Sequence, residues 1–85
     1  MNNPEMQRSI LAILARLDGI AVRETVLATE TEIAVKHPLT TQEFHREMGE
    51  LIGTRRVKRS FDAFGEALYE ITGAGKDALM GRAQA

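Results

Sequence analysis

The hydrophobic pattern of the chain changes its period at Gly53, and this change constrains the fold class more than any other feature. Before Gly53 the apolar residues recur every three or four positions, as on one face of a helix. After it they alternate with polar residues in two short runs, residues 57–61 and 67–71. The segment Asp62–Glu66 between the runs contains a glycine, which predicts a β-hairpin. We therefore expect a mainly α protein with a small β-hairpin.

The first helix is marked by Asn3, a good N-cap residue, followed by Pro4 at the first helical position. Its apolar positions follow the spacing i, i+3, i+4, i+7: Ile10, Ile13, Leu14 and Leu17. Asp18-Gly19 is a typical helix stop, because glycine readily takes the left-handed conformation. Ile20 and Ala21 are then expected to form a short strand.

A second helix is expected from about Arg23 to Lys36, ending at His37-Pro38 because the residue before proline avoids the α region. Three threonines and a valine lower its intrinsic propensity. Its expected apolar stripe is Val22, Val26, Leu27, Ile33 and Ala34.

A third helix is predicted by Thr40 and Glu43, whose spacing forms a capping box. Its expected buried stripe is Phe44, Met48, Leu51 and Ile52, and Gly53 is placed to end it. A short last helix is expected from a Thr72 cap through Met80, with a frayed tail from Gly81 onward.

Composition limits the class of protein. Eighty-five residues with 44% hydrophobic and 27% charged side chains predict one globular domain, residues 1–85, with an ordered core of about 4–80. The absence of cysteine fits a reducing compartment, so a cytoplasmic location is expected. The longest apolar run, residues 10–15, is too short for a membrane span, so no membrane association is expected. With a net charge of −1, any binding to nucleic acid must come from a local basic patch.

The predicted order of three helices, hairpin and short helix resembles a winged helix, with a three-helix core and the hairpin as its two-stranded wing. Residues 50–59 resemble the end of a recognition helix that runs into the first wing strand. Residues 69–79 resemble the ending of small prokaryotic or phage-encoded winged-helix proteins of the MarR and PadR kinds. The resemblance covers Thr40 to Leu79, and it implies a DNA-binding regulator of transcription. The connector of residues 36–39 departs from the tight turn of a compact helix-turn-helix.

The third helix is the candidate reading helix. If its apolar stripe is buried, its outward face carries Gln42, His45, Arg46 and Gly49. Gln and Arg side chains have the geometry for paired hydrogen bonds to base edges in the major groove of double-stranded DNA. Against this, the same helix carries three acidic residues, Glu43, Glu47 and Glu50, and a solvated amphipathic face is the alternative interpretation.

The basic run Arg55, Arg56, Lys58 and Arg59 lies at the base of the expected wing, where each cation can neutralise a DNA phosphate. The alternative is that these charges protect a half-exposed strand from aggregation. Phe61 and Phe64 flank the wing turn, where an exposed aromatic can insert into a minor groove or dock on a partner. Such residues more often pack on Tyr69 and the helices.

No catalytic set is recognisable, so no enzyme activity and no cofactor are expected. His37 and His45 lack companions at metal-ligand spacing, which predicts no metal site. Gly73-x-Gly75-Lys76 lacks the full phosphate-loop pattern and is interpreted as a helix start.

Two functions remain as hypotheses. One is DNA binding through the third helix and the wing. The other is a protein-interaction module on the same scaffold, favoured by the near-neutral charge and the acidic third helix. A homodimer is possible in either case, with the first helix as its surface if both stripes of that helix prove apolar.

Overall fold

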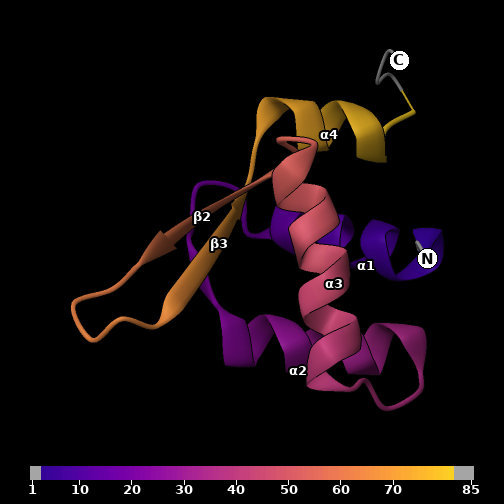
Figure 1. Ribbon diagram of the computed structural model, residues 1–85. Coiled ribbons are helices and arrows are strands. Elements are labelled where there is room, and N and C mark those ends of the chain that lie inside the picture. The colour runs from indigo at the N-terminus through magenta and orange to yellow at the C-terminus, as the bar shows by residue number, and fades with distance from the viewer. Residues whose placement is uncertain (1–2, 82–85) are drawn as a thin grey trace.

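The computed structural model describes residues 3–81, which form four helices and a three-stranded sheet (Figure 1). In chain order the elements are α1 (Pro4–Arg16), β1 (Val22–Arg23), α2 (Glu24–Val35), α3 (Thr41–Gly53), β2 (Val57–Phe61), β3 (Ala67–Ile71) and α4 (Gly73–Leu79). Residues 82–85, most of the predicted frayed tail, lie outside the described residues.

Helix α1 forms as predicted from its N-terminal signals. The Asn3 side chain accepts the Met6 backbone N–H at 3.1 Å, and Pro4 occupies the first turn. Gly19 follows the helix with a φ of +85°, as expected for a stop. The apolar residues of α1 belong to the core: Met6, Ile10, Leu11, Ile13 and Leu14. The outward side carries Glu5, Arg8, Ala12 and Arg16, so the condition for an apolar dimer stripe on this helix is not met.

The short strand predicted at Ile20 and Ala21 is wrong by two residues. The strand β1 is Val22–Arg23, and it pairs antiparallel with β3 through Val22 opposite Tyr69. Val22 is buried, whereas Ile20 and Ala21 are exposed. The register is decided by the partner strand, because only Val22 reaches the core when it pairs with Tyr69.

Helix α2 has nearly the predicted length but a different buried side. Leu27 and Thr31 are fully buried, and the Thr31 hydroxyl donates to the Leu27 carbonyl at 2.7 Å. Of the predicted stripe, Val26, Ile33 and Ala34 are exposed, and Val22 is buried in β1. Apolar residues spread over more than half of the circumference of α2, so periodicity could not select the side that packs on α1.

Helix α3 begins with the predicted capping box. The Glu43 N–H donates to the Thr40 hydroxyl at 3.0 Å, and the Thr40 N–H donates to Oε1 of Glu43 at 3.0 Å. The predicted stripe is confirmed for Phe44, Met48 and Leu51, with Ile52 half-buried.

The end of α3 differs from the prediction. Gly53 stays helical, and Arg55 instead takes the left-handed conformation with a φ of 63°. The Arg56 N–H donates to the Leu51 carbonyl at 2.9 Å and the Arg55 N–H to the Ile52 carbonyl at 3.0 Å. These two bonds form a Schellman motif in which arginine occupies the position that usually holds glycine.

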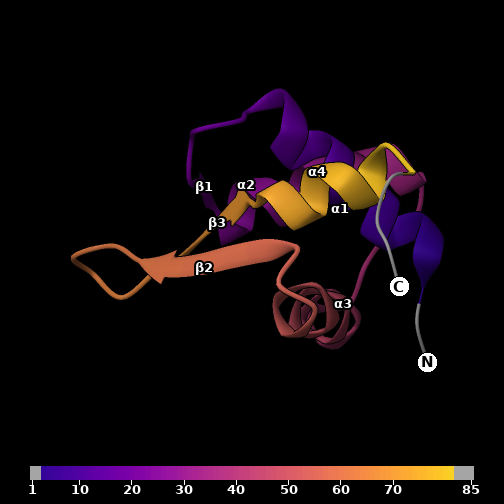
Figure 2. The same ribbon diagram turned by 90° about the horizontal axis from the view of Figure 1, so that it is seen from above.

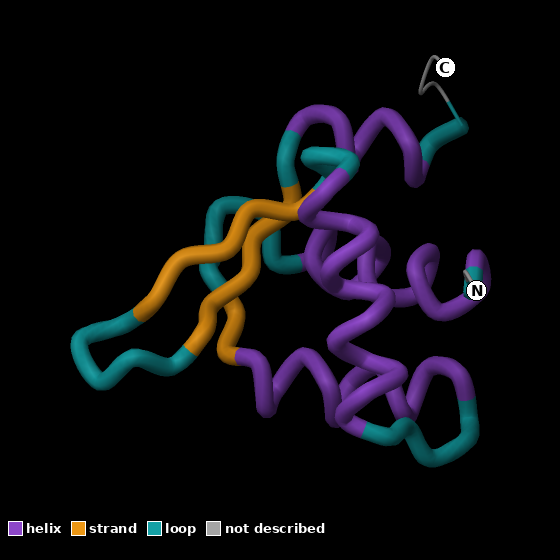
Figure 3. The backbone as a smooth tube through the Cα atoms, viewed as in Figure 1, coloured by secondary structure: helices purple, strands orange, loops and turns teal. Residues whose placement is uncertain are grey.

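The hairpin formed by β2 and β3 has the predicted bounds, with Arg59 opposite Tyr69. The sheet order is β1-β3-β2, so β3 is central. Figures 1 and 2 show the hairpin projecting past the helices on one side of α3, and Figure 3 shows its turn as the part farthest from the helical core. Three helices, a projecting hairpin and a closing helix make the fold a winged helix, as predicted.

Helix α4 starts at the predicted Thr72 cap, whose hydroxyl accepts the Gly75 N–H at 3.1 Å. The same hydroxyl donates to the Arg55 carbonyl at 2.6 Å, and the Thr72 N–H donates to the Arg56 carbonyl at 3.1 Å. The end of α3, the start of β2 and the start of α4 are therefore joined at one point.

Candidate nucleic-acid interface

The outward face of α3 carries the four residues that the sequence placed there. Gln42, His45, Arg46 and Gly49 are all exposed. Helix α3 lies beside the projecting hairpin (Figure 2). No large apolar side chain lies among its exposed residues, and Gly49 leaves open space for a close approach.

The acidic residues of α3 do not form the acidic surface that the sequence suggested. Glu43 is engaged by Thr40 in the capping box, and Glu47 is only 1% exposed. Glu50 alone of the three is fully on the surface. The interpretation of this helix as an acidic, solvated face is therefore wrong for Glu47.

Glu47 joins α3 to the start of α1. Its Oε1 accepts the Gln7 side-chain amide at 2.7 Å and the Asn3 N–H at 3.1 Å, and its Oε2 accepts Nε of Arg46 at 3.3 Å. Burial alone raises the pKa of Glu47, but these hydrogen bonds outweigh it and leave the pKa below its ordinary value. The charge is thus kept inside the fold, and Arg46 keeps its two terminal nitrogens for other contacts.

His45 is held in place by a hydrogen-bonded network that the sequence did not reveal. Its Nε2 lies 2.9 Å from Oε2 of Glu24, and the Tyr69 hydroxyl donates to Oε1 of Glu24 at 2.8 Å. The bond to His45 holds the pKa of Glu24 below its usual range, while burial and the bond to Glu24 raise the pKa of Tyr69 to about 12. The network joins α2, α3 and β3, so it fixes the wing relative to the outward face of α3.

A hollow of about 330 Å³ separates α3 from the wing. Arg59 and Phe61 line it from β2, and His45 and Gly49 line it from α3. The Arg59 guanidinium lies 5.5 Å from the centre of the Phe61 ring, within range of a cation–π contact. Arg59 therefore faces the same side of the molecule as His45.

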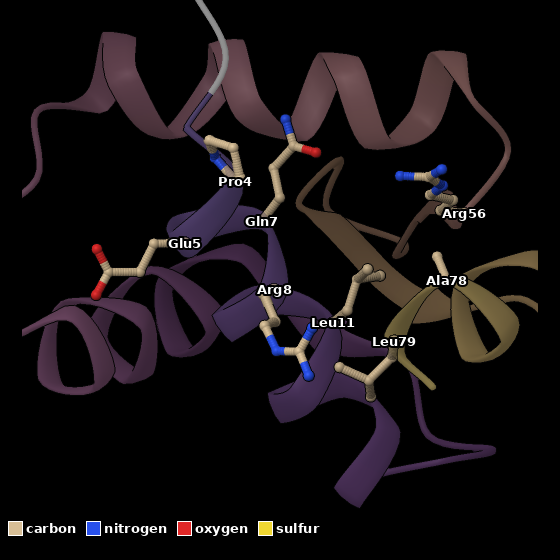
Figure 4. A pocket seen from close by; sticks show the side chains of 8 residues that line it. All are labelled: Pro4, Glu5, Gln7, Arg8, Leu11, Arg56, Ala78 and Leu79. Atoms are coloured by element: carbon tan, nitrogen blue, oxygen red, sulfur yellow. The ribbon is translucent and has the colours of Figure 1, made fainter. Parts of the chain in front are cut away.

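The four residues of the basic run do not share one surface. Arg55, Lys58 and Arg59 line a second hollow of about 380 Å³ at the end of α3. Lys58 also lies 3.8 Å from Glu70 across the hairpin. Arg56 instead points into a groove between α1 and α4, where Figure 4 shows it opposite Gln7. Arg56 lies in the turn between α3 and β2, outside the strand that carries Lys58 and Arg59.

The turn of the wing is ordered and carries an exposed aromatic. Oδ1 of Asp62 accepts the Phe64 and Glu66 N–H groups at 2.8 and 2.9 Å, and Arg23 binds Oδ2 of Asp62 at 3.1 Å and Oε1 of Glu66 at 2.6 Å. Phe61 is 61% exposed and Phe64 is 95% exposed. The expectation that these rings pack on Tyr69 and the helices is therefore wrong, because the hairpin extends beyond the helices.

The described part of the chain was also searched for metal sites and for membrane-spanning helices. Residues 3–81 contain no group of three histidine or acidic side chains arranged to hold a metal ion. Among the same residues, no helix has the length and apolar character needed to cross a bilayer.

No protein-family model matches the chain, and no curated protein sequence matches it. Among solved structures, the chain is similar to RosR from H. salinarum, with a TM-score of 0.76 and 21% identity over 89% of this chain. The match spans 66% of the RosR chain, just under two thirds of its length. The chain is also similar to a protein from Thermoplasma acidophilum that is named as a transcriptional regulator, with a TM-score of 0.71, 20% identity, and coverage of 94% of this chain and 76% of that one. At this level of identity, the likeness shows the fold.

Proposed function

We propose that this protein is a non-enzymatic, DNA-binding regulator of transcription that reads bases with α3 and contacts phosphates from the base of its wing. The observation that carries the proposal is the outward face of α3. It presents Gln42 and Arg46 without a large apolar side chain, and it lies beside a wing whose base carries Arg55, Lys58 and Arg59. The similarity to a protein named as a transcriptional regulator supports it.

The backbone at Arg55 gives independent support. A left-handed conformation costs a non-glycine residue about 1–2 kcal/mol, and glycine would close this Schellman motif without that cost. The Arg55 side chain has no hydrogen-bond or ion-pair partner within residues 3–81 that repays the cost. A strained residue at a surface site points to a functional constraint. A contact between the exposed Arg55 guanidinium and a DNA phosphate is a functional constraint of this kind.

The phosphate contacts are tested by the double variant Arg55→Glu/Lys58→Glu. Binding to a fluorescent random duplex is measured by anisotropy over a salt series. We expect affinity at low salt to fall by about tenfold or more, and the salt dependence of log K to become shallower by about two, because two counterion-releasing contacts are lost.

The matched control is Arg16→Glu/Lys76→Glu, which changes the net charge by the same amount on α1 and α4. Both residues pair with surface acids, Glu30 and Asp18, so their loss costs little stability. The control is expected to keep most of the affinity. Equal loss in both double variants would mean that only net charge matters, and no binding by the wild-type protein at any salt would contradict DNA binding itself.

Base reading is tested separately with Gln42→Ala and Arg46→Ala. Once a preferred site has been selected from random duplexes, each variant is expected to lose about 1–3 kcal/mol of discrimination against a changed base pair, while non-specific binding stays nearly the same. Competition binding with matched and mismatched duplexes measures this. Unchanged discrimination in both variants would remove α3 as the reading helix.

A protein-interaction module is the second candidate, and the exposure of Phe64 favours it. An aromatic side chain on a turn fixed by hydrogen bonds is a typical interface anchor, because little ordering entropy is lost on binding. If the wild-type chain fails to bind duplex DNA, Phe64→Ala should abolish its interaction with a partner while leaving the thermal stability of the free protein unchanged.

For the first candidate, DNA binding, the sequence of residues 69–79 supports a MarR- or PadR-like regulator of prokaryotic or phage origin.

A further inference from the structure

Glu24, in the first turn of α2, accepts hydrogen bonds from two other elements. Its Oε1 accepts the Tyr69 hydroxyl at 2.8 Å, and its Oε2 lies 2.9 Å from Nε2 of His45. The positive end of the helix macrodipole favours a carboxylate at this place. The bonds to His45 and Tyr69, together with the nearby charge of Arg59, lower the pKa of Glu24. The Glu24 carboxyl group is therefore ionised at neutral pH.

The ionised state of Glu24 decides where the proton lies on the His45 ring. A carboxylate carries no proton and only accepts hydrogen bonds, so the proton in this contact lies on Nε2. A neutral imidazole has one proton for its two nitrogens, and Nδ1 of His45 therefore keeps its lone pair. Nδ1 has no hydrogen-bond partner within residues 3–81, and the His45 side chain is 51% exposed. An acceptor is thus available on the outward face of α3.

This acceptor differs in chemistry from its neighbour Arg46, whose guanidinium only donates hydrogen bonds. In the major groove, the exocyclic amino groups of adenine and cytosine are donors, whereas the keto oxygens of guanine and thymine are acceptors. We propose that Glu24 holds neutral His45 as the Nε2–H tautomer, and that Nδ1 of His45 accepts a hydrogen bond from the amino group of an adenine or a cytosine. The base contact rests on the proposed DNA binding, whereas the tautomer does not depend on it.

His37, the other histidine of the chain, provides an internal reference with the opposite tautomer. Its Nδ1 lies 3.0 Å from the carbonyl oxygen of Pro38, which only accepts hydrogen bonds. The neutral His37 ring is therefore expected to carry its proton on Nδ1. The two histidines should differ in the same spectrum, so neither needs an external standard.

The tautomers are measured without DNA, from long-range proton–nitrogen NMR correlations of the histidine rings at mildly alkaline pH, where imidazoles are neutral. Spectra of His37→Gln and His45→Asn assign the signals. We expect the Nε2–H pattern for His45 and the Nδ1–H pattern for His37. Glu24→Gln should give a mixture of tautomers at His45, because an amide both donates and accepts. The control Glu50→Gln, which changes an exposed carboxylate on α3, should leave both patterns unchanged.

Thermal unfolding confirms that each variant is folded. An Nδ1–H pattern for His45 in the wild-type protein would overturn the inference, whatever the protein binds. An unchanged Nε2–H pattern in folded Glu24→Gln would also overturn it, because Glu24 would then not set the tautomer.

The base contact is measured at the same pH on a preferred site selected from random duplexes, with each base pair changed in turn. His45→Leu should lose about fivefold discrimination at one base pair, the lower end of the range for base-edge hydrogen bonds. His45→Asn should keep most of it, because its side-chain oxygen also accepts and lies close to the position of Nδ1.

Base analogues that lack the amino group distinguish adenine from cytosine as the donor. Purine in place of adenine, or pyrimidinone in place of cytosine, should weaken binding of the wild-type protein at that base pair. The same analogue should have a smaller effect on His45→Leu, which has already lost the contact.

Equal discrimination by the wild-type protein and His45→Leu at every base pair would overturn the base contact while leaving DNA binding intact. A wild-type protein that binds no duplex would contradict the proposed function and the base contact together. The NMR result would still decide the tautomer, so the two failures are distinguishable.

Discussion

Gly75→Ala is expected to destabilise the protein by about 3 kcal/mol, whereas Gly73→Ala, two residues earlier in the same helix, should be neutral or slightly stabilising. A Cβ atom on Gly75 would overlap with the carbonyl oxygen of Arg56 and lie 2.8 Å from Cγ1 of Ile71. The first contact is with backbone, which cannot move aside as a flexible side chain can. A Cβ atom on Gly73 meets nothing within 4 Å.

The loss of stability in Gly75→Ala is large because the Arg56 carbonyl, which the added Cβ atom would displace, already accepts a hydrogen bond. It accepts the Thr72 N–H at 3.1 Å, and the Gly75 N–H donates to the Thr72 hydroxyl at 3.1 Å. Moving α4 away from β2 would weaken both bonds together with the packing of Ile71. Thermal unfolding measures the difference, and about 3 kcal/mol corresponds to a loss of more than 10 °C in Tm for a domain of this size. Equal Tm values for the two alanine variants would show that α4 does not pack this closely on Arg56.

Glu47→Ala is expected to cost about 2–4 kcal/mol at neutral pH. The substitution leaves the Asn3 N–H and the Gln7 amide without the acceptor that binds them at 3.1 and 2.7 Å. It also opens a cavity at a site that is 1% exposed. Glu50→Ala, one turn on and exposed, is the matched control and should change stability by less than about 0.5 kcal/mol.

The pH dependence of Glu47 follows from its lowered pKa. A carboxyl group whose pKa is lower in the folded state than in the unfolded state stabilises the fold above the unfolded pKa, and this stabilisation is lost as the pH falls through the folded pKa. The neutral variant Glu47→Gln lacks this contribution. The wild-type protein should therefore have a larger unfolding free energy than Glu47→Gln at neutral pH. This difference in unfolding free energy should narrow as the pH falls below the ordinary pKa of a glutamate.

Urea unfolding of the wild-type protein and of Glu47→Gln across this pH range measures the difference in unfolding free energy. A constant difference at every pH would show that ionisation of Glu47 does not contribute to stability. A gap that widens toward acid would contradict the direction of the pKa shift.

Sequence signals predicted an element well where its hydrogen bonds join residues that are close together in the chain. The Asn3, Thr40 and Thr72 caps each formed the expected bond, and the hairpin bounds were correct. A cap needs only residues within one turn, so it can be recognised from sequence. The candidate reading face of α3 was also placed correctly, because Phe44, Met48 and Leu51 define its buried side.

The helical period of α3 also accounts for the burial of Glu47. It lies three residues after Phe44 and four before Leu51, so its position on the helix predicts burial even though its side chain is charged. The partners that make burial tolerable, Asn3 and Gln7, are more than 39 residues away and gave no local sign. The network of Glu24, His45 and Tyr69 likewise joins three elements that only folding brings together.

Interactions within a few residues and the period of apolar side chains were enough to predict the helices, their caps, the hairpin and the winged-helix order. Packing in the folded protein selected the buried side of α2, paired Val22 rather than Ile20 with the sheet, and turned Arg56 away from Arg55 and Lys58. These outcomes depend on which distant surface each segment meets. The free energy of packing against that surface, rather than local propensity, selects among arrangements that the sequence pattern allows equally.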